Sequence, residues 1–499
     1  IRMLESASSS EEGSTIQLSN SIKAAEKQEY GTNESSCAHL AEGEKGSETG
    51  AASSHPLWQR VIGVLLLTLF SIFALLDRFS TAGVLPSIQE FYDISNTEAG
   101  SIQTIYIIVY IVAIGVVGAF GDRYDKKLML LVCGVVWTII IVASSLVPSN
   151  MFWLFVTLRA LTAIGLATSS CFGATMIAEY FDGAAREYAL MFFFMSLSIG
   201  ACAGIALGGF FVGSAYFMWA IRAAPCGLVI TIALMIPLLP STRRFASTTI
   251  GMKASLSLIT RDLLAIIRVK TFVFAMLTVI TYNFYLIGHA WWVTTFYKDA
   301  MESRNYSSEV YHDIPYEQMV TIQSITATLS GCIGCFAGVA IAERWSSGWG
   351  PFRRIRTPRA PLLVLAVGFV ILTPVKYLYH YFMTRDYFAA LAFSEIGNFS
   401  NGALFTLGNS VIMNVIEPSR RTKAVALLNM LQSATGDAPA PVIVGALFDA
   451  FKNGDNSAVA TYDALLKALN IVAAVNPTGV IWSLLAAFFY KADMERIRS

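Results

Sequence analysis

Charged residues are scarce in this chain. Of its 499 residues, 14% are Asp, Glu, Lys or Arg and 55% are hydrophobic, whereas a soluble domain carries roughly 25% charged residues. The deficit indicates that most of the chain is not solvated by water. The formal net charge is +1, and no basic block lies outside the hydrophobic pattern. We therefore expect no nucleic-acid partner.

The sequence also lacks the motifs of catalysis and of nucleotide or metal binding. It contains no hydrolase triad, no Walker-type phosphate loop, no GxGxxG motif and no metal-ligand spacing. We expect a protein that is not an enzyme and needs no cofactor, with an ion gradient rather than ATP as its energy source. The seven cysteines form no disulfide pattern. Cys332 and Cys335 lie in a run of small residues, which favours close helix packing over redox or zinc chemistry.

Long hydrophobic runs dominate the sequence after residue 56. Residues 1–56 are rich in Ser, Glu, Gly and Ala and are predicted to be a disordered cytosolic tail. A spanning helix needs about 20 apolar residues. Twelve such runs follow, at 57–85, 99–120, 128–147, 151–178, 186–213, 215–239, 271–296, 319–342, 360–382, 386–416, 423–450 and 464–490. The pattern predicts an all-α membrane protein.

Lys and Arg gather in alternate loops, after the second, sixth, eighth and tenth runs. This asymmetry predicts that those loops and both termini are cytosolic. The longest internal loop, 240–270, divides the chain into six-helix halves at 57–239 and 271–490, and its apolar spacing predicts an amphipathic helix on the membrane surface. Residues 491–499 are predicted to be a cytosolic tail. Asn305 begins an Asn-Tyr-Ser acceptor for glycosylation on the opposite side.

A glycine-rich and charged motif joins the second and third runs. Its glycines permit close packing and a tight turn, while its charges hold the loop at the cytosolic face. The motif comprises Gly118, Gly121, Asp122, Arg123, Lys126 and Lys127, and a weaker copy after the eighth run comprises Gly338, Glu343 and Arg344. It resembles the signature loop of the major facilitator superfamily. A repeat at the same point of two six-helix halves is what that fold predicts, and we expect both copies to gate the halves.

Ionisable residues inside spans are costly and are candidates for function. Asp77 and Arg159 each lie about eight residues from the outer end of a run, or about 12 Å in a helix. We expect them to meet as an ion pair that faces a central cavity. Protonation of Asp77 would then release Arg159, which suits a proton-coupled movement. A static structural pair is the alternative interpretation.

Four further residues are candidates for substrate binding. Arg78 follows Asp77, and Glu395 lies at a similar depth in the second half. Arg222 could pair with Asp77 or could have only a structural role. His289 titrates near neutral pH. It precedes Trp291 and Trp292, so it could instead be part of an interfacial anchor.

Specific residues resemble the spinster homologues, lipid transporters of the major facilitator superfamily, over about 57–490. The similar segments are 77–89, the signature loop, 219–225, 418–427 and Gly436-Asp437-Ala438 with Pro441. The resemblance implies alternating access and the transport of single-chain lipids, such as lysophospholipids or sphingosine-1-phosphate. It also implies proton coupling through Asp77, Arg78 and Arg159, a location in lysosomes or late endosomes with the plasma membrane second, and a monomer.

The chain departs from the spinster pattern at two positions. Leu166 and Asn398 stand where family members typically carry Glu. An uncoupled lipid facilitator is therefore an alternative to a proton-coupled carrier. A proton-coupled organic-anion carrier similar to sialin is another, as is a receptor or scaffold on the same fold. The segments 219–225 and 418–441 favour the spinster interpretation.

Overall fold

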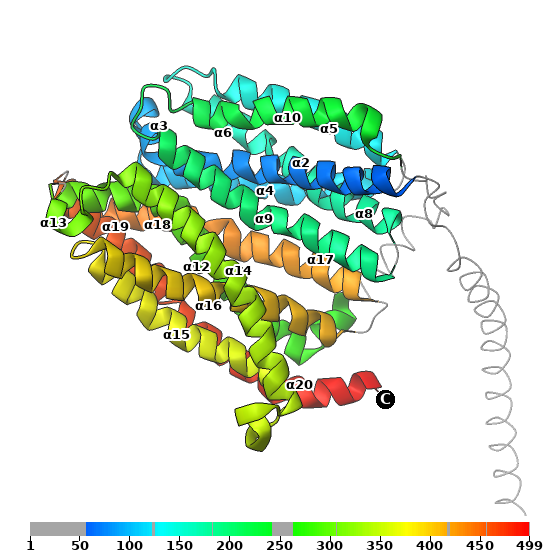
Figure 1. Cartoon of the computed structure of the whole chain (residues 1–499). Helices are drawn as coiled ribbons and strands as arrows, with labels where there is room; N and C mark the ends of the chain where they lie inside the picture. The colour runs from blue at the N-terminus through cyan, green and yellow to red at the C-terminus, as the bar shows by residue number, and fades with distance from the viewer. Residues whose placement is uncertain are drawn as a thin grey trace, which may run out of the picture.

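The computed structural model describes residues 56–121, 125–181, 183–241, 263–305, 307–416, 420–455 and 457–498. All regular secondary structure in these ranges is helical. Figure 1 shows the helices in two groups that lie side by side. The predicted N-terminal tail, residues 1–56, lies outside the described residues except for Pro56. Most of the predicted linker at 240–270 also lies outside them.

The first group is built from the first half of the chain. A π-helical turn, η1, interrupts its fourth predicted span, and Pro225 and Pro237 lie within α10. The elements are α2 (Leu57–Gly83), α3 (Leu85–Tyr92), α4 (Asn96–Gly121), α5 (Lys126–Ser144), α6 (Phe152–Leu161), α7 (Ala163–Thr168), η1 (Ser169–Gly173), α8 (Ala174–Tyr180), α9 (Gly183–Phe211) and α10 (Trp219–Leu238).

The second group repeats this plan with longer helices. A π-helical turn, η4, again interrupts one predicted span, here the eleventh. The elements are α12 (Lys270–Ser303), α13 (Ser308–Tyr311), α14 (Tyr316–Ser347), η2 (Gly350–Ile355), α15 (Ala360–Phe382), α16 (Tyr387–Asn414), α17 (Arg421–Gln432), η4 (Ser433–Asp437), α18 (Pro439–Lys452), α19 (Ala458–Ala473) and α20 (Asn476–Arg498).

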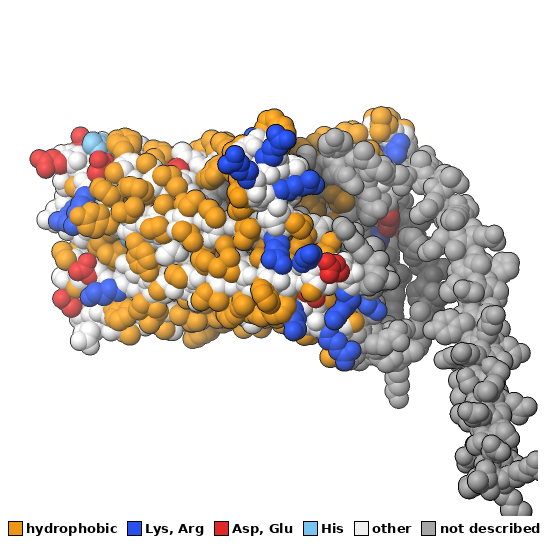
Figure 2. Space-filling view, turned by 90° about the horizontal axis from the view of Figure 1, so that it is seen from below, with side chains coloured by type: hydrophobic (Ala, Val, Ile, Leu, Met, Phe, Trp, Pro, Cys, Tyr) orange, Lys and Arg blue, Asp and Glu red, His pale blue; other side chains and the backbone are white. Residues whose placement is uncertain are grey.

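Ten segments of the described chain are long and apolar enough to cross a membrane. The tenth predicted span corresponds to α16, and the eleventh corresponds to α17, η4 and α18 together. Both carry more polar residues. Figure 2 shows a broad apolar surface on one face of the molecule, with Lys and Arg gathered toward one end. Large exposed hydrophobic side chains such as Phe336 and Phe488 are expected where lipid replaces water.

Several helix boundaries differ from the prediction. Helix α12 continues to Ser303 and α14 begins at Tyr316, so helix extends into the segment between the predicted spans at 271–296 and 319–342 from both sides. Helix α20 continues to Arg498, through the predicted tail at 491–499. Asp493 explains this extension, because its Oδ2 accepts from the backbone N–H and the hydroxyl of Thr271, at 2.8 and 2.7 Å. The end of α20 is thereby held against the start of α12.

The two halves are joined at the end of the bundle where α3 and α13 lie, which we call the joined end (Figure 1). Asp449 on α18 accepts hydrogen bonds from the backbone N–H and the side chain of both Asn96 and Thr97, at the start of α4. The Trp291 indole donates to the Ala99 carbonyl at 3.2 Å. Among the described residues, the hydrogen bonds that we find between the halves all lie toward this end.

Candidate functional site

Asp77 and Arg159 form a buried ion pair inside the first half. Nη1 of Arg159 donates to Asp77 Oδ1 at 2.7 Å, while Nη2 donates to the Asp77 carbonyl at 2.8 Å and to the Thr81 hydroxyl. Both charged side chains are almost fully buried. The predicted ion pair between Asp77 and Arg159 is confirmed. The pair was expected to face a central cavity, but it is buried inside the first half.

One oxygen of this pair has no partner among the described residues. Asp77 Oδ2 is buried and accepts no hydrogen bond, although Oδ1 is occupied by Arg159. A buried acceptor without a partner costs free energy, on the order of 1–3 kcal/mol. A carboxylate with one oxygen paired and one vacant can accept a proton at Oδ2 without first losing a hydrogen bond there. The local geometry is therefore compatible with a group that gains and loses a proton.

Arg78, the next residue on α2, belongs to a second group of polar residues, which lies where the halves meet. Its guanidinium lies over the ring of Tyr106, 5.5 Å from the centroid. With the Gln103 amide oxygen facing it, Arg78 donates from Nη2 at 2.5 Å and from Nε at 3.0 Å. It also exerts an electrostatic attraction on Asp437 of η4, in the other half. Arg78, Gln103, Tyr106 and Asp437 form what we call the central polar cluster.

A π-helical turn contributes one member of this cluster. η4 lies against α4 of the first half and supplies Asp437, while the other π-helical turn, η1, supplies Ser170, which shares a hydrogen bond with Tyr110 outside the cluster. A π-helical turn shifts the register of the side chains that follow it and is frequent at functional sites. Asp437 is buried and its Oδ1 has no partner among the described residues, while Oδ2 accepts from Ser433. The cluster therefore keeps a vacant acceptor within the electrostatic field of Arg78.

The first predicted gating motif is partly described. Gly118 and Gly121 belong to the last turns of α4, and Asp122 and Arg123 lie outside the described residues. Lys126 forms an ion pair with Glu179 of α8. Lys127 donates to the carbonyl of Ile236, at the end of α10, at 2.8 Å. The two lysines thus tie the start of α5 to α8 and to α10.

The second gating motif is packed differently. Gly338 lies against Ala403 of α16, and a Cβ on Gly338 would come within 2.6 Å of the Ala403 Cβ. Glu343 and Arg344 are exposed, with Arg344 over the ring of Trp349 at 5.0 Å.

Asn305 is exposed just after α12, with a positive φ of 48°. Glycosylation at Asn305 stays a prediction.

Of the two interpretations of Arg222, the structure supports the structural role and not the pairing with Asp77. Arg222 donates from Nε to the Ser145 hydroxyl at 3.1 Å and from Nη2 to the Ser145 carbonyl at 3.0 Å, where it satisfies the end of α5. Asp77 has Arg159 as its partner instead. Arg222 is therefore positioned for helix capping, and the structure does not bring it to the central polar cluster.

Glu395 and His289 lie within the second half. Glu395 accepts hydrogen bonds from the hydroxyls of Thr326, at 2.9 Å, and Ser330, both on α14. His289 packs among aromatic rings, stacked on His380 with centroids 5.9 Å apart. An interfacial anchor at His289 is excluded, because Trp291 and Trp292 are themselves buried. Neither residue belongs to the central polar cluster.

Sequence reasoning missed Lys376 and His380, which lie on α15 beside His289. Both are 2% exposed. The signal was available, because Lys376 is an ionisable residue inside the predicted span at 360–382, six residues from its end. Among the described residues, no group of three or more His, Cys, Asp or Glu side chains is placed to hold a metal ion.

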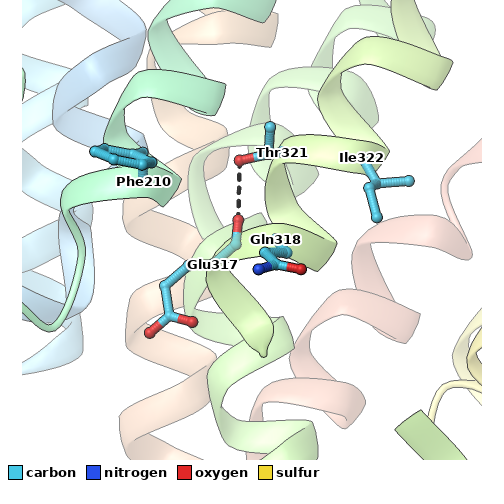
Figure 3. Close-up of a pocket in the computed structure, with 5 residues that line it drawn as sticks. All are labelled: Phe210, Glu317, Gln318, Thr321 and Ile322. Carbon is cyan, nitrogen blue, oxygen red and sulfur yellow. Dashed lines mark hydrogen bonds between the residues drawn. The ribbon is translucent and has the colours of Figure 1, made fainter. Parts of the chain in front are cut away.

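A shallow pocket of about 270 Å³ opens at the seam of the halves, lined by Phe210 of α9 and by residues of α14 (Figure 3). Thr321 donates to the Glu317 carbonyl within it, at 2.9 Å. The lining is mostly apolar and includes none of Asp77, Arg78, Arg159 or Asp437. We therefore do not assign this pocket to the candidate site.

Two helical halves with corresponding motifs, joined at one end, define a multi-pass membrane protein of the two-half transporter architecture. The chain belongs to the Major Facilitator Superfamily, whose family profile matches residues 67–452. Among solved structures, a bacterial homolog of the human lysosomal transporter Spinster, in an inward-facing conformation, superposes with a TM-score of 0.66 at 16% identity, and covers 89% of this chain and 98% of its own. This match supports the fold.

Curated relatives confirm the resemblance to spinster homologues. "Sphingosine-1-phosphate transporter SPNS2" of Mus musculus is 29% identical over 447 residues, which are 86% of this chain and 78% of the relative. "Protein spinster homolog 1" of Homo sapiens is 29% identical over 441 residues, 87% of this chain and 81% of the relative. "Protein spinster homolog 3" of Danio rerio is 28% identical over 390 residues, 78% and 76% of the two chains.

Proposed function

We propose that this chain is a secondary transporter that moves single-chain lipids, of the lysophospholipid or sphingosine-1-phosphate type, by alternating access and coupled to protons. The observation that carries the proposal is the buried Asp77–Arg159 pair with its vacant Asp77 oxygen. Neutralising Asp77 removes the counter-charge of Arg159 in a dry site. An uncompensated buried charge is strongly unfavourable, by about 3–5 kcal/mol, which is enough to shift a two-state equilibrium.

The central polar cluster supports the substrate class. It places one cation, Arg78, beside the Tyr106 ring and within the field of Asp437. A phosphate headgroup would bind the guanidinium bidentately, and this would free Asp437 from its attraction. A choline or sphingoid amine would instead bind the carboxylate and the ring. A zwitterionic headgroup suits a cluster with both signs of charge. A simple organic anion has no cationic group that could bind Asp437.

The conformation supports a carrier whose halves are held together at one end. The halves are hydrogen-bonded at the joined end, and Lys and Arg side chains gather toward the opposite end (Figure 2). With the basic loops in the cytosol, the joined end is non-cytosolic. We propose both termini in the cytosol, a monomer that needs no cofactor and has no enzymatic activity, and a location in lysosomes or late endosomes, with the plasma membrane second.

The test is flux of a labelled lysophospholipid into liposomes that contain the full chain, with and without an inward-acidic pH gradient. Asp77→Asn keeps the size of the side chain and removes its titration. We expect wild-type flux to rise at least about tenfold with the gradient, which corresponds to about 1.4 kcal/mol of coupling, and the variant to lose this response. Asp463→Ala, an exposed carboxylate on α19, is the matched control and should respond as wild type does.

Two other outcomes separate the alternatives. Lysolipid flux that changes neither with the pH gradient nor in Asp77→Asn would identify an uncoupled facilitator. It would point to Leu166 and Asn398 as the positions where acidic residues needed for coupling are missing. Flux of a sugar acid or dicarboxylate without any lysolipid flux would overturn the lipid proposal in favour of a sialin-like carrier. No flux of either class would favour a receptor or scaffold.

A further inference from the structure

The second half contains a buried basic group that the proposed mechanism does not use. Lys376 of α15 is 2% exposed and forms no ion pair or hydrogen bond with any described residue. Its ammonium lies 5.8 Å from the ring centroid of Tyr285 and 5.7 Å from that of Tyr379. Its aliphatic chain passes over Gly397 of α16, where a Cβ would come within 2.7 Å of Lys376 Cε. The lysine is therefore enclosed by α12, α15 and α16.

Two histidines lie beside this lysine. His289 of α12 and His380 of α15 stack with ring centroids 5.9 Å apart and an interplanar angle of 18°. Nδ1 of His380 lies 2.6 Å from the amide oxygen of Asn470. An amide oxygen only accepts hydrogen bonds, so Nδ1 carries the proton and Nε2 of neutral His380 is a vacant base. The Nε2 atoms of both histidines are buried without a partner among the described residues.

The charges around the group leave it without a fixed counter-ion in contact. Glu395 of α16 attracts Lys376 electrostatically, but its two oxygens accept from Thr326 and Ser330 of α14. The other titratable groups that face the cluster are phenols, which stay neutral near pH 7: Tyr285 on α12, Tyr379 on α15 and Tyr462 on α19. Three bases thus share a site in which a second positive charge would be strongly repelled.

We infer that Lys376, His289 and His380 form a second proton-binding site, in the half opposite Asp77, which holds one proton among three basic side chains. The inference rests on the proposed proton coupling. A proton is the ligand that fits, because Lys376 and His380 are too deeply buried to receive a lipid headgroup. Lysine is also the basic side chain that changes protonation state when buried, whereas arginine stays charged.

The test compares Lys376→Arg and Lys376→Met in the full chain. The unfolding temperature of the purified protein is measured from about pH 5 to about pH 9, a range that includes the ionisation of histidine. We expect the wild type to show a step with pH, and both variants to move its midpoint toward acid by at least about one pH unit, or tenfold in proton affinity. The weaker histidine bases are then the only groups left to take the proton.

The arginine variant separates proton binding from a static charge. If Lys376→Arg restores the wild-type midpoint while Lys376→Met does not, the lysine is a fixed charge and the inference fails. It also fails if the wild type shows no step, or if both variants keep its midpoint. Lys467→Met, on the exposed face of α19, is the control and should leave the step unchanged.

Lysolipid flux measured beside the unfolding temperature keeps this site separate from the proposed function. A midpoint that moves in the Lys376 variants, in a protein that transports no lysolipid, would uphold the proton site and overturn the function. If the protein transports lysolipid with proton coupling and the Lys376 variants keep the wild-type midpoint, the proposed function is upheld and the proton site is overturned.

Discussion

At the scale of single residues, the Asp77–Arg159 pair was predictable because helix geometry fixes depth. Two residues at the same distance from one membrane surface, on helices of one half, have few other partners. The sequence did not specify the additional acceptors, the Asp77 carbonyl and the Thr81 hydroxyl. These contacts follow from the planar fork of the guanidinium, which reaches a side chain and a backbone group at once. They explain why arginine stands at position 159.

Arg159→Lys tests this geometry. An ammonium can replace Nη1 at Asp77 Oδ1 but cannot also reach both other acceptors, so charge-assisted hydrogen bonds worth about 1.5–3 kcal/mol each are lost. We expect a clearly lower unfolding temperature in a thermal denaturation series. The control is Arg385→Lys, where an exposed arginine donates to the Tyr381 carbonyl, and this change should have little effect. Equal unfolding temperatures for all three proteins would contradict the role of the fork.

At the scale of elements, the contact between α2 and α9 depends on small residues. Gly200, Gly204 and Gly208 recur every four residues on α9 and lie against the backbone of α2. In a membrane, helix association relies on close van der Waals packing rather than on the hydrophobic effect. This row holds α2, and with it Asp77 and Arg78, at a fixed distance from α9.

Gly204→Ala should separate these helices. A Cβ at Gly204 would lie 2.7 Å from the Leu76 carbonyl oxygen and 2.9 Å from the Ser80 nitrogen, both backbone atoms that cannot rotate away. We expect a loss of about 1–3 kcal/mol, seen as a lower unfolding temperature. Gly115→Ala on α4, where no atom lies within 4 Å, is the matched control and should be neutral or slightly stabilising. The packing argument fails if both variants behave alike.

At the scale of the whole molecule, Asp449 connects the halves. The sequence assigns it to no motif, yet it caps the start of α4 across the interface, together with Ser95 and Glu98 of the local capping box. The anionic side chain also complements the N-terminal end of the helix dipole. The joined end is therefore held in part by a carboxylate that lies more than three hundred residues away in the chain.

Asp449→Ala should loosen the joined end. The variant loses its hydrogen bonds to Asn96 and Thr97, and a shift of about 1.4 kcal/mol would change the population of the open state about tenfold. A cysteine placed at Thr104, which donates to the Ala438 carbonyl, should then react about tenfold faster with an impermeant maleimide applied at the joined end. Chains without the added cysteine supply the background. Unchanged labelling relative to Asp463→Ala would show that other contacts hold this end.

The sequence by itself determined the class of protein, the positions of the spans, the division into two halves and the pairing of Asp77 with Arg159. These follow from local properties: hydrophobic length, the placement of basic loops and helical rise, none of which requires a tertiary contact. Only the tertiary structure decided that Arg222 binds Ser145, that His289 faces Lys376 and His380, and that Asp449 caps α4. Each of these contacts depends on the rotation of a helix about its axis. That rotation is set by the packing of both faces against neighbouring helices, and the apolar spans of this chain have too little amphipathic pattern to reveal it.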